Sequence, residues 1–507
     1  MSESERGSPR APSSASDDAL PRVVIHKLST GVPGLDEVLG GGIPEYSFNL
    51  LAGAPGTGKT TLAQQILFAV ATPERPGLFF TVLGEPAVKM LRYQQQFSFF
   101  DPARVGNDVR FLNLSDEVLT QDLESVLDRI TAEVERSNPG IVIVDSFRTV
   151  IRAADGSTVG ELTLQHFVQR LALRLTSWEA TTFLIGEFAD GESRDPVFTV
   201  ADGVIWLMNE VERNTSVRKL RVTKVRGQAP QPGLHSVRMS RAGVEVFPRQ
   251  AAMPARPAVP QQRHRLSTGV AELDTMIGGG IPAGDSILVT GPTGSGKTIL
   301  GTQFVAEGAR KGECAVIAVF EEHPRAYVER AKNLGFDLDA MIAAGTLDIL
   351  YLRPLDLSVD ETLHEIQEAV AKTKARRVVI DSLTGLEIAL APTFEQDFRE
   401  SLYRLIGALT GVGITILMTV EVTDSFTELR FSPHEVSFMT NDIVLQRYVE
   451  IESQLCRVMT VIKTRSRKHS SDLRSYEITS QGIAVGESFK DYRGIISGVP
   501  QLRQEKP

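Results

Sequence analysis

The 507-residue sequence has little cysteine, no excess of positive charge and no long apolar run. Its two cysteines, Cys314 and Cys456, are too few for a disulfide framework or a cysteine-ligated metal site, and we interpret them as reduced thiols. No stretch approaches the roughly 18 uncharged apolar residues of a membrane-spanning helix, and no apolar segment follows the charged residues near the N-terminus. We therefore expect a cytoplasmic protein without a membrane partner.

The charge balance is acidic, with a formal net charge of -9 and an isoelectric point of about 5.6. Proteins that bind nucleic acid mainly through its phosphates are usually basic, so the balance argues against a nucleic-acid partner. Hydrophobic residues at 42% and charged residues at 23% are typical of globular chains. The length suits two or three domains.

An internal duplication organises the chain. The segment His26–Pro44 returns 238 positions later as His264–Pro282, with thirteen of nineteen residues identical. A stretch rich in Pro, Ala and Gln separates the copies and is typical of a linker. The expected organisation is a disordered tail at 1–22, a first domain at 23–247, a linker at 248–263, a second domain at 264–500 and a short tail at 501–507.

Each half alternates short apolar runs with amphipathic stretches. The runs lie at 47–53, 78–83, 109–114, 140–146 and 181–187 in the first half, and at 286–291, 315–322, 347–352, 376–382 and 414–420 in the second. Such alternation predicts an α/β fold in each half, with a mostly parallel sheet flanked by helices.

Each half also carries a glycine-rich phosphate-binding loop after its first apolar run. Residues 53–60 read GAPGTGKT and residues 291–298 read GPTGSGKT. Glycines let backbone amides converge on phosphates at a helix N-terminus, the lysine reaches the β and γ oxygens, and the threonine ligates Mg²⁺. We expect ATP to contact Gly53, Gly56, Thr57, Gly58, Lys59, Thr60 and Thr61 in the first half, and Gly291, Thr293, Gly294, Ser295, Gly296, Lys297, Thr298 and Ile299 in the second. Thr60 and Thr298 are the expected Mg²⁺ ligands.

An acidic residue ends a later apolar run in each half, and the second half has a further acidic pair. Asp145 and Asp381 end equivalent runs, where a carboxylate can hold the magnesium ion through water; each could instead cap a helix. Glu321 and Glu322 end another run of the second half and could polarise an attacking water or hydroxyl.

The two halves differ at this last position. Leu83 and Gly84 occupy the places of Glu321 and Glu322 in the first half, and neither can act as a base. The alternative for the glutamates is a solvated strand end. We nevertheless expect Glu321 and Glu322 to be catalytic, with Lys297, and Glu321 to be a further metal ligand.

A Lys-x-Arg triplet lies late in each half, at Lys224–Arg226 and Lys463–Arg465. Alternation along a strand places the two cations of each triplet on one face. They could be a solvated edge. In the functional interpretation they reach the γ-phosphate of ATP in a neighbouring subunit, as arginine fingers do.

These motifs resemble those of the KaiC family of RecA-like ATPases and autokinases over about residues 24–500. The resemblance implies two tandem RecA-like domains in a homo-hexameric double ring, with ATP at the subunit interfaces. It also implies slow ATP hydrolysis in the first domain and autophosphorylation of adjacent Ser and Thr residues in the second. Ser437 occupies the position of the serine, whereas Phe438 replaces the threonine, so the two-site cycle cannot run in that form. Ser432 and Thr440 are the alternative acceptors.

Three functions compete at this point. The first is an ATPase with serine autokinase activity that acts as a signalling oligomer. The second is an ATPase of the wider RecA superfamily that acts on nucleic acid, although the acidic charge and the lack of a basic domain count against it. The third is a nucleotide-sensing scaffold with little turnover, which presents its rings to a histidine kinase or response regulator.

Overall fold

The computed structural model describes residues 24–81, 87–114, 123–146, 161–189, 196–212, 215–249, 264–352, 358–389, 398–422, 438–465, 467–490, 492–495 and 501–502. Several sequence predictions fall outside these ranges: the tail at 1–22, the positions of Leu83 and Gly84, all but the first two residues of the linker, and Ser437.

The first domain contains a nine-stranded sheet and its flanking helices. Its elements are β1 (Lys27–Leu28), α1 (Leu35–Leu39), β2 (Ile43–Pro44), β3 (Phe48–Gly53), α2 (Lys59–Val70), β4 (Gly77–Thr81), α3 (Ala87–Gln94), η1 (Pro102–Arg104), β5 (Val109–Asn113), α5 (Leu123–Ser137), β6 (Ile141–Asp145), α7 (Glu161–Ser177), β7 (Thr181–Glu187), α8 (Pro196–Val200), β8 (Gly203–Glu212), β9 (Thr215–Val225), β10 (His235–Ser240) and β11 (Gly243–Phe247).

The second domain repeats this plan. Its elements are β12 (Arg265–Leu266), α9 (Ala271–Met276), β13 (Ile281–Pro282), β14 (Ser286–Gly291), α10 (Lys297–Arg310), β15 (Ala315–Val319), α11 (Pro324–Lys332), α12 (Leu338–Ala343), β16 (Leu347–Tyr351), α13 (Val359–Thr373), β17 (Arg377–Asp381), α14 (Leu383–Ala389), α15 (Phe398–Gly411), β18 (Thr415–Glu421), β19 (Asp442–Ile451), β20 (Gln454–Thr464), β21 (Arg474–Thr479), β22 (Gly482–Ser488), β23 (Tyr492–Arg493) and β24 (Gln501–Leu502).

Both large sheets combine a parallel part with an antiparallel extension. The strand order is β11-β10-β9-β8-β3-β7-β6-β4-β5 in the first domain and β16-β15-β17-β18-β14-β19-β20-β21-β22 in the second. The strands from β8 to β5, and from β16 to β19, run parallel, and the remaining three strands of each sheet are antiparallel. The predicted fold, two α/β domains with mostly parallel sheets, is therefore confirmed.

Helices cover both faces of each sheet because the central strands are apolar on both sides. In the first domain Phe48 and Leu50 pack with α5 and α7, whereas Leu51 packs with α1 and α2 on the opposite face. In the second domain Leu288 packs with α13 and α15, whereas Ile287 packs with α9 and α10. The central strands β3 and β14 are thus buried from both sides, and each leads directly into a glycine-rich loop.

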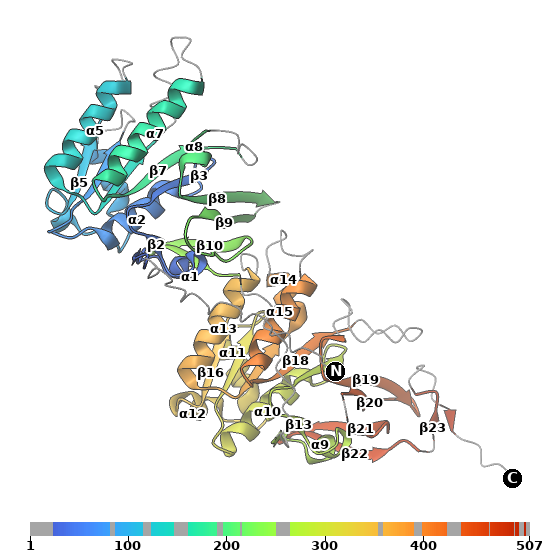
Figure 1. Ribbon diagram of the computed structural model, residues 1–507. Helices are drawn as coiled ribbons and strands as arrows, with labels where there is room; N and C mark the ends of the chain where they lie inside the picture. Colours follow the sequence, from blue (N-terminus) through green and yellow to red (C-terminus); the bar gives the residue numbers. More distant parts are fainter. Residues whose placement is uncertain are drawn as a thin grey trace, which may run out of the picture.

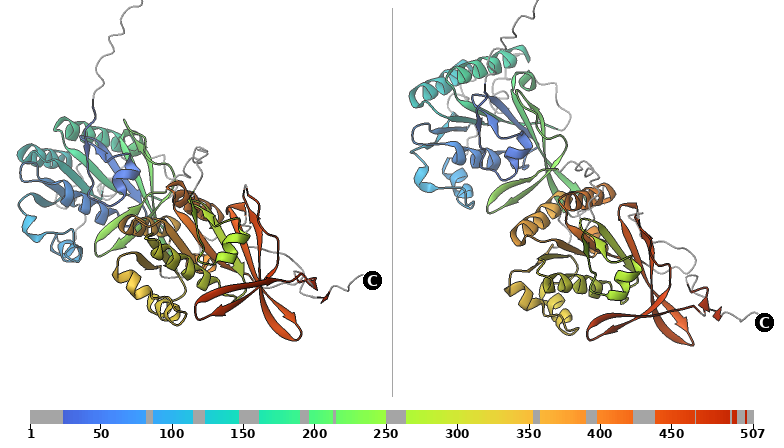
Figure 2. Two further views of the ribbon diagram at one scale, coloured as in Figure 1. Left: turned by 90° about the horizontal axis from the view of Figure 1, so that it is seen from below. Right: turned by 60° about the horizontal axis from the view of Figure 1, so that its bottom comes forward.

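The two domains lie against each other through β10 and β11 of the first and α13 of the second (Figure 1). Figure 2 shows the hairpins β19–β20 and β21–β22 at the end of the second domain that faces away from the first. None of the helices in the described ranges is long and apolar enough to cross a bilayer.

A small two-stranded sheet lies late in the chain. Gln501 and Leu502, at the start of the expected tail, form β24 and pair with β23. Ile495 between these strands is buried against Val449 and Val458 of the β19–β20 hairpin. This apolar contact holds β23 against the hairpin.

Candidate functional site

The first glycine-rich loop connects β3 to α2 and folds around its own lysine. The Lys59 Nζ donates to the carbonyl oxygens of Gly53 and Ala54 at 2.9 and 2.8 Å. Gly53 is required because a Cβ at this position would collide with the carbonyl oxygen of Leu207. Gly58 precedes the helix with φ 100°, a conformation that L side chains rarely adopt.

The second loop repeats this geometry between β14 and α10. The Lys297 Nζ donates to the carbonyl oxygens of Gly291 and Pro292, both at 2.8 Å. Gly296 precedes α10 with φ 98°. Both loops therefore place an amine and a helix N-terminus at the carboxyl end of a central strand, which is a common phosphate site.

The electrostatics of the two lysines are also alike. Burial lowers the pKa of Lys59, an effect that Glu187 and Asp145 oppose. Burial likewise lowers the pKa of Lys297, opposed by Glu421, Asp381 and Glu321. Partly desolvated amines among backbone carbonyls gain much from a phosphate, because the phosphate supplies the negative charge that stabilises the ammonium form.

The remaining polar residues of the loops hold the loops in shape. The Thr57 hydroxyl donates to the Ala54 carbonyl at 2.9 Å, and the Thr293 hydroxyl donates to Glu421 at 2.5 Å. Ser295 is fully buried and donates to the Gln446 side chain at 3.2 Å. Thr61 and Ile299 are half-buried in the first turns of α2 and α10.

The strand-end aspartates lie beside the loops but have different partners. The Thr60 hydroxyl donates to Asp145 at 2.7 Å, whereas Asp381 accepts from Thr419 at 2.5 Å. Burial raises the pKa of Asp145, although the Thr60 hydrogen bond and Lys59 oppose this. The first loop thus joins its threonine and aspartate directly.

These oxygens fit a magnesium ion that is shared with a nucleotide. No group of three or more His, Cys, Asp or Glu residues in the described ranges could hold a metal by itself. Mg²⁺ prefers oxygen ligands and commonly uses one or two protein oxygens together with phosphates and waters. The hydroxyl and carboxylate of Thr60 and Asp145 are such a pair.

Sequence reasoning missed one acidic residue in each half. Glu187 ends β7 in register with Gly53, and Glu421 ends β18 in register with Gly291. The signal was present, because both glutamates follow apolar runs, as the two aspartates do. Each places a further carboxylate next to its loop lysine.

The structure separates the paired glutamates of the second half. Glu321 accepts a hydrogen bond from the Ser382 hydroxyl at 2.8 Å, directly after Asp381. Glu322 forms an ion pair with both terminal nitrogens of Arg330 on α11. Glu321 also acts electrostatically on Lys297 of the loop, whereas Glu322 pairs with a helix, although the two residues are adjacent in sequence.

Each glycine-rich loop lies at the carboxyl end of a central strand, and the Lys-x-Arg triplet of the same domain lies toward the opposite end of that strand. In the first sheet Lys224 pairs with Val204, which in turn pairs with Leu50 of the central strand. In the second sheet Lys463 pairs with Ile443, which pairs with Leu288. Three residues of strand, about 10 Å at 3.3 Å per residue, separate each lysine's level from the loop, and the arginines lie farther still. Each pair therefore faces away from the phosphate site of its own domain.

The predicted phosphorylation segment adjoins the second triplet. Ser437 lies outside the described residues, but Phe438 is 49% exposed and its carbonyl oxygen accepts from Arg465 at 2.8 Å. The Thr440 carbonyl accepts from Lys463 at 2.9 Å. Thr440, an alternative phosphate acceptor, is fully buried.

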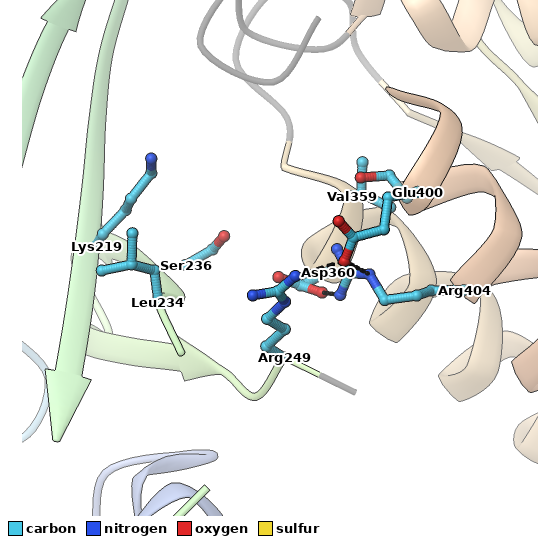
Figure 3. A pocket seen from close by; sticks show the side chains of 9 residues that line it. Lys219, Leu234, Ser236, Arg249, Val359, Asp360, Glu400 and Arg404 are labelled. Carbon is cyan, nitrogen blue, oxygen red and sulfur yellow. Dashed lines mark hydrogen bonds and ion pairs between the residues drawn. The ribbon is translucent and has the colours of Figure 1, made fainter. Parts of the chain in front are cut away.

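Charged residues of both domains meet at a cavity of about 260 Å³ between them (Figure 3). Lys219, Leu234 and Ser236 line it from the first domain, Arg249 from the start of the linker, and Val359, Asp360, Glu400, Ser401 and Arg404 from the second domain. The Arg404 guanidinium pairs with Asp360 at 2.6 Å, and Arg249 pairs with Glu400. The Arg249–Glu400 pair joins the two sides of the cavity, so the cavity is part of the domain interface.

Comparisons with known proteins place both halves in one family. A family model described as "ATPase: KaiC" matches residues 28–251 and again 266–490. The circadian clock oscillator protein KaiC of Picosynechococcus is 30% identical over 498 residues, which cover 96% of this chain and 95% of that protein. The circadian clock oscillator protein KaiC 1 of Synechocystis is 30% identical over 498 residues, which cover 95% and 93%.

A third relative extends the comparison. The circadian clock oscillator protein KaiC of Thermosynechococcus vestitus is 29% identical over 489 residues, which cover 94% of this chain and 92% of that protein. The matches span both sheets and both glycine-rich loops rather than one shared motif. The chain therefore belongs to the KaiC family of ATPases.

Proposed function

We propose that the chain is an ATPase and serine autokinase that acts as a cytoplasmic, nucleotide-dependent signalling oligomer, with its chemistry mainly in the second domain. The position of Glu321 carries this proposal. Its carboxylate accepts a hydrogen bond from Ser382 and lies near enough to the loop lysine to oppose the lowering of the Lys297 pKa, whereas the aligned first-half residues are Leu83 and Gly84.

ATP binding is assigned to both loops. Backbone amides of each loop and the N-terminus of α2 or α10 would surround the phosphates, with Lys59 or Lys297 at the β and γ oxygens. Mg²⁺, when bound, neutralises phosphate charge. Thr60 with Asp145, and Thr298 with Asp381, would hold it, and Glu321 would be a further ligand in the second domain.

In the second domain Glu321 would accept the proton of the attacking group. With water, the oxygen bonds to the γ-phosphorus, the bond from that phosphorus to the β–γ bridging oxygen breaks, and ADP leaves. With a serine hydroxyl the same exchange yields phosphoserine and ADP. Glu322 would contribute indirectly, because its pairing with Arg330 fixes the backbone that carries Glu321.

The Lys-x-Arg pairs would complete the site of a neighbouring subunit. Lys463 and Arg465 lie away from their own loop and toward the opposite edge of the sheet, so they reach a γ-phosphate only when subunits assemble in a ring. There they would offset the negative charge of phosphoryl transfer. Lys224 and Arg226 would do the same for ATP in the first domain, which we assign as a structural ligand in a double-ring homo-hexamer.

Ser437 is the proposed phosphate acceptor. It precedes Phe438, whose carbonyl contacts Arg465, so the serine adjoins the pair that would face a neighbour's ATP. Phosphorylation would add about −1.5 to −2 charges near these cations. We propose that this change alters the ring and is read by a histidine kinase or response regulator.

Two measurements test this function. Incubation with Mg-ATP labelled at the γ-phosphate should yield released phosphate and labelled protein, and neither should rise when single-stranded DNA is added. Strong stimulation by DNA would favour the nucleic-acid ATPase instead. Release and labelling that both stay at background would favour a scaffold with little turnover.

Mass spectrometry then locates the phosphate. Wild type should carry it on Ser437, Ser437→Ala should lose it, and Glu321→Gln should lose both the phosphate and most turnover. Ser432→Ala is the matched control within the same segment and should keep the label. Undiminished labelling of Ser437→Ala would exclude the assigned acceptor while leaving the ATPase intact.

A further inference from the structure

Arg226 and Arg465, the arginines proposed to contact a neighbouring subunit's ATP, are each held by one residue, and the two holding residues have the same structural role. The Arg226 amide donates to the Asp202 carbonyl at 2.9 Å, and the Arg465 amide donates to the Asn441 carbonyl at 3.0 Å. The Asp202 side chain accepts from the Phe48 amide at 3.0 Å. The Asn441 side chain accepts from the Ser286 amide at 3.1 Å. Asp202 and Asn441 thus anchor the start of the central strand in the same way.

Asp202 carries a negative charge, whereas Asn441 is neutral. The second carboxylate oxygen of Asp202 pairs with the Arg226 guanidinium at 3.1 Å. Asn441 offers no such charge, and within the described ranges Arg465 forms no ion pair but donates to the Phe438 carbonyl at 2.8 Å. Asp442 does not replace the missing partner, because it is fully buried and paired with Arg467.

A carboxylate beside the arginine opposes contact with phosphate in two ways. The arginine must leave its partner, and the carboxylate repels the phosphate that approaches. A backbone carbonyl is a weaker partner and carries no net charge. Since 61% of the Arg226 side chain and 29% of the Asp202 side chain are exposed, solvent screens this effect, and a change of about two- to fivefold is expected.

We propose that Asp202 is a positioning residue that restrains Arg226, and that the Asp202/Asn441 difference leaves the second-domain arginine the freer of the two to contact a neighbour's ATP. The inference rests on the proposed function, in which both arginines act across subunit interfaces. Arg226 would therefore attract a neighbour's phosphate less strongly than Arg465 does, because of the negative charge of Asp202.

The first test replaces Asp202 by asparagine in the full chain, an exchange that Asn441 shows to be compatible with the anchoring hydrogen bond. Assembly is followed by light scattering during titration with a non-hydrolysable ATP analogue and Mg²⁺. Asp202→Asn should lower the half-saturating concentration about two- to fivefold, and the gain should shrink at high salt. Adding Arg226→Ala should remove the gain, as a double-mutant cycle requires.

The opposite exchange tests the second domain. Asn441→Asp should slow phosphate release about two- to fivefold, and this slowing should vanish in an Arg465→Ala background. A half-saturating concentration that is unchanged or higher in Asp202→Asn, or a gain that persists without Arg226, would overturn the inference. If Arg226→Ala alone leaves assembly unchanged, the trans role in the proposed function fails instead.

Discussion

The two halves of the chain share the groups proposed to bind a nucleotide and differ in the groups that would act on it. Lys59 and Lys297 make equivalent contacts to loop carbonyls, and a carboxylate ends the same strand beside each loop. In the second half Glu321 lies near Lys297, whereas the aligned residues of the first half are Leu83 and Gly84. Binding geometry is thus duplicated while the candidate base is not, so duplication alone does not predict two equal active sites.

The hairpins that cover the two loops extend the comparison. In each domain a glutamine of the loop helix accepts from a backbone amide of the strand at one end of the large sheet: Gln65 from Val244, and Gln303 from Ile483. The first hairpin also carries Arg238, which pairs with Glu361 and Glu365 of α13 in the second domain. The first loop is therefore linked to the other domain through one hairpin.

The largest expected effect separates Glu321 from Glu322. Glu321→Gln should lower the rate of ATP hydrolysis by about 10² to 10⁴, the usual contribution of a general base. Glu322→Gln should have a much smaller effect, because Glu322 faces Arg330. Phosphate release at saturating ATP measures both.

Lys59→Ala in the same assay gives the matched comparison between the halves. At a protein concentration high enough for the Lys59→Ala subunits to assemble, phosphate release by the second domain should still be measurable. Complete loss of hydrolysis with assembly intact would assign the chemistry to the first domain and reverse the comparison.

The next effect concerns assembly. Lys59→Ala removes the amine that would hold first-domain ATP, so it should raise the nucleotide concentration needed for the hexamer roughly tenfold to a hundredfold, as loss of a charged hydrogen bond does. Light scattering with a non-hydrolysable analogue measures this. Lys297→Ala should have the smaller effect on assembly, and a monomer under every nucleotide condition would refute the ring.

The sequence was sufficient for the parallel half of each sheet and for both loops. A continuous apolar run such as that of β6 predicts a strand that is buried on both faces of a sheet. Each glycine-rich motif follows such a strand and precedes a helix, which is the context that a phosphate-binding loop requires. The antiparallel extensions were not predicted as such, because strands like β9 alternate apolar residues with Lys and Arg at half-buried positions.

Contacts that depend on tertiary arrangement were beyond sequence reasoning. Glu187 follows an apolar run, as Asp145 does, but its place beside Lys59 depends on β7 lying next to β3, which the sequence does not give. The different partners of Glu321 and Glu322 likewise follow from the positions of Ser382 and Arg330. The link from Arg238 to Glu361 joins two domains and leaves no pattern in either.

A smaller effect should follow from cutting that link. Arg238→Ala would remove the ion pairs to Glu361 and Glu365 and leave the half-buried Glu361 without its cation. The free energy of unfolding should fall by about 1 to 3 kcal/mol, the usual cost of orphaning a buried polar group. Urea unfolding measures this, and Lys372→Ala, which breaks an exposed pair with Asp348, should cost under about 1 kcal/mol.

The smallest effect should come from a histidine in the first domain near the same interface. His235 is fully buried; its Nδ1 accepts from the Arg249 amide at 2.8 Å, and its Nε2 lies 3.2 Å from the Gln231 carbonyl. The neutral ring with a proton on Nε2 satisfies both contacts, whereas a second proton on Nδ1 would break the first. Burial accordingly lowers the pKa of His235, against the opposing influence of the Gln231 carbonyl and Asp360.

Because the folded-state pKa of His235 lies below its unfolded value, the unfolded chain binds the extra proton more readily once the pH falls below about 6.5, the ordinary pKa of histidine. The stability that the neutral ring contributes is fully present above that pH and is lost as the pH falls toward the folded-state pKa. Thermal unfolding at pH 7.5 and 5.5 should show a lower Tm at pH 5.5, and His235→Gln should reduce this difference. His264→Gln, an exposed control, should leave it unchanged. An undiminished pH dependence in His235→Gln would show that other groups, rather than this histidine beside the domain interface, set the response to acid.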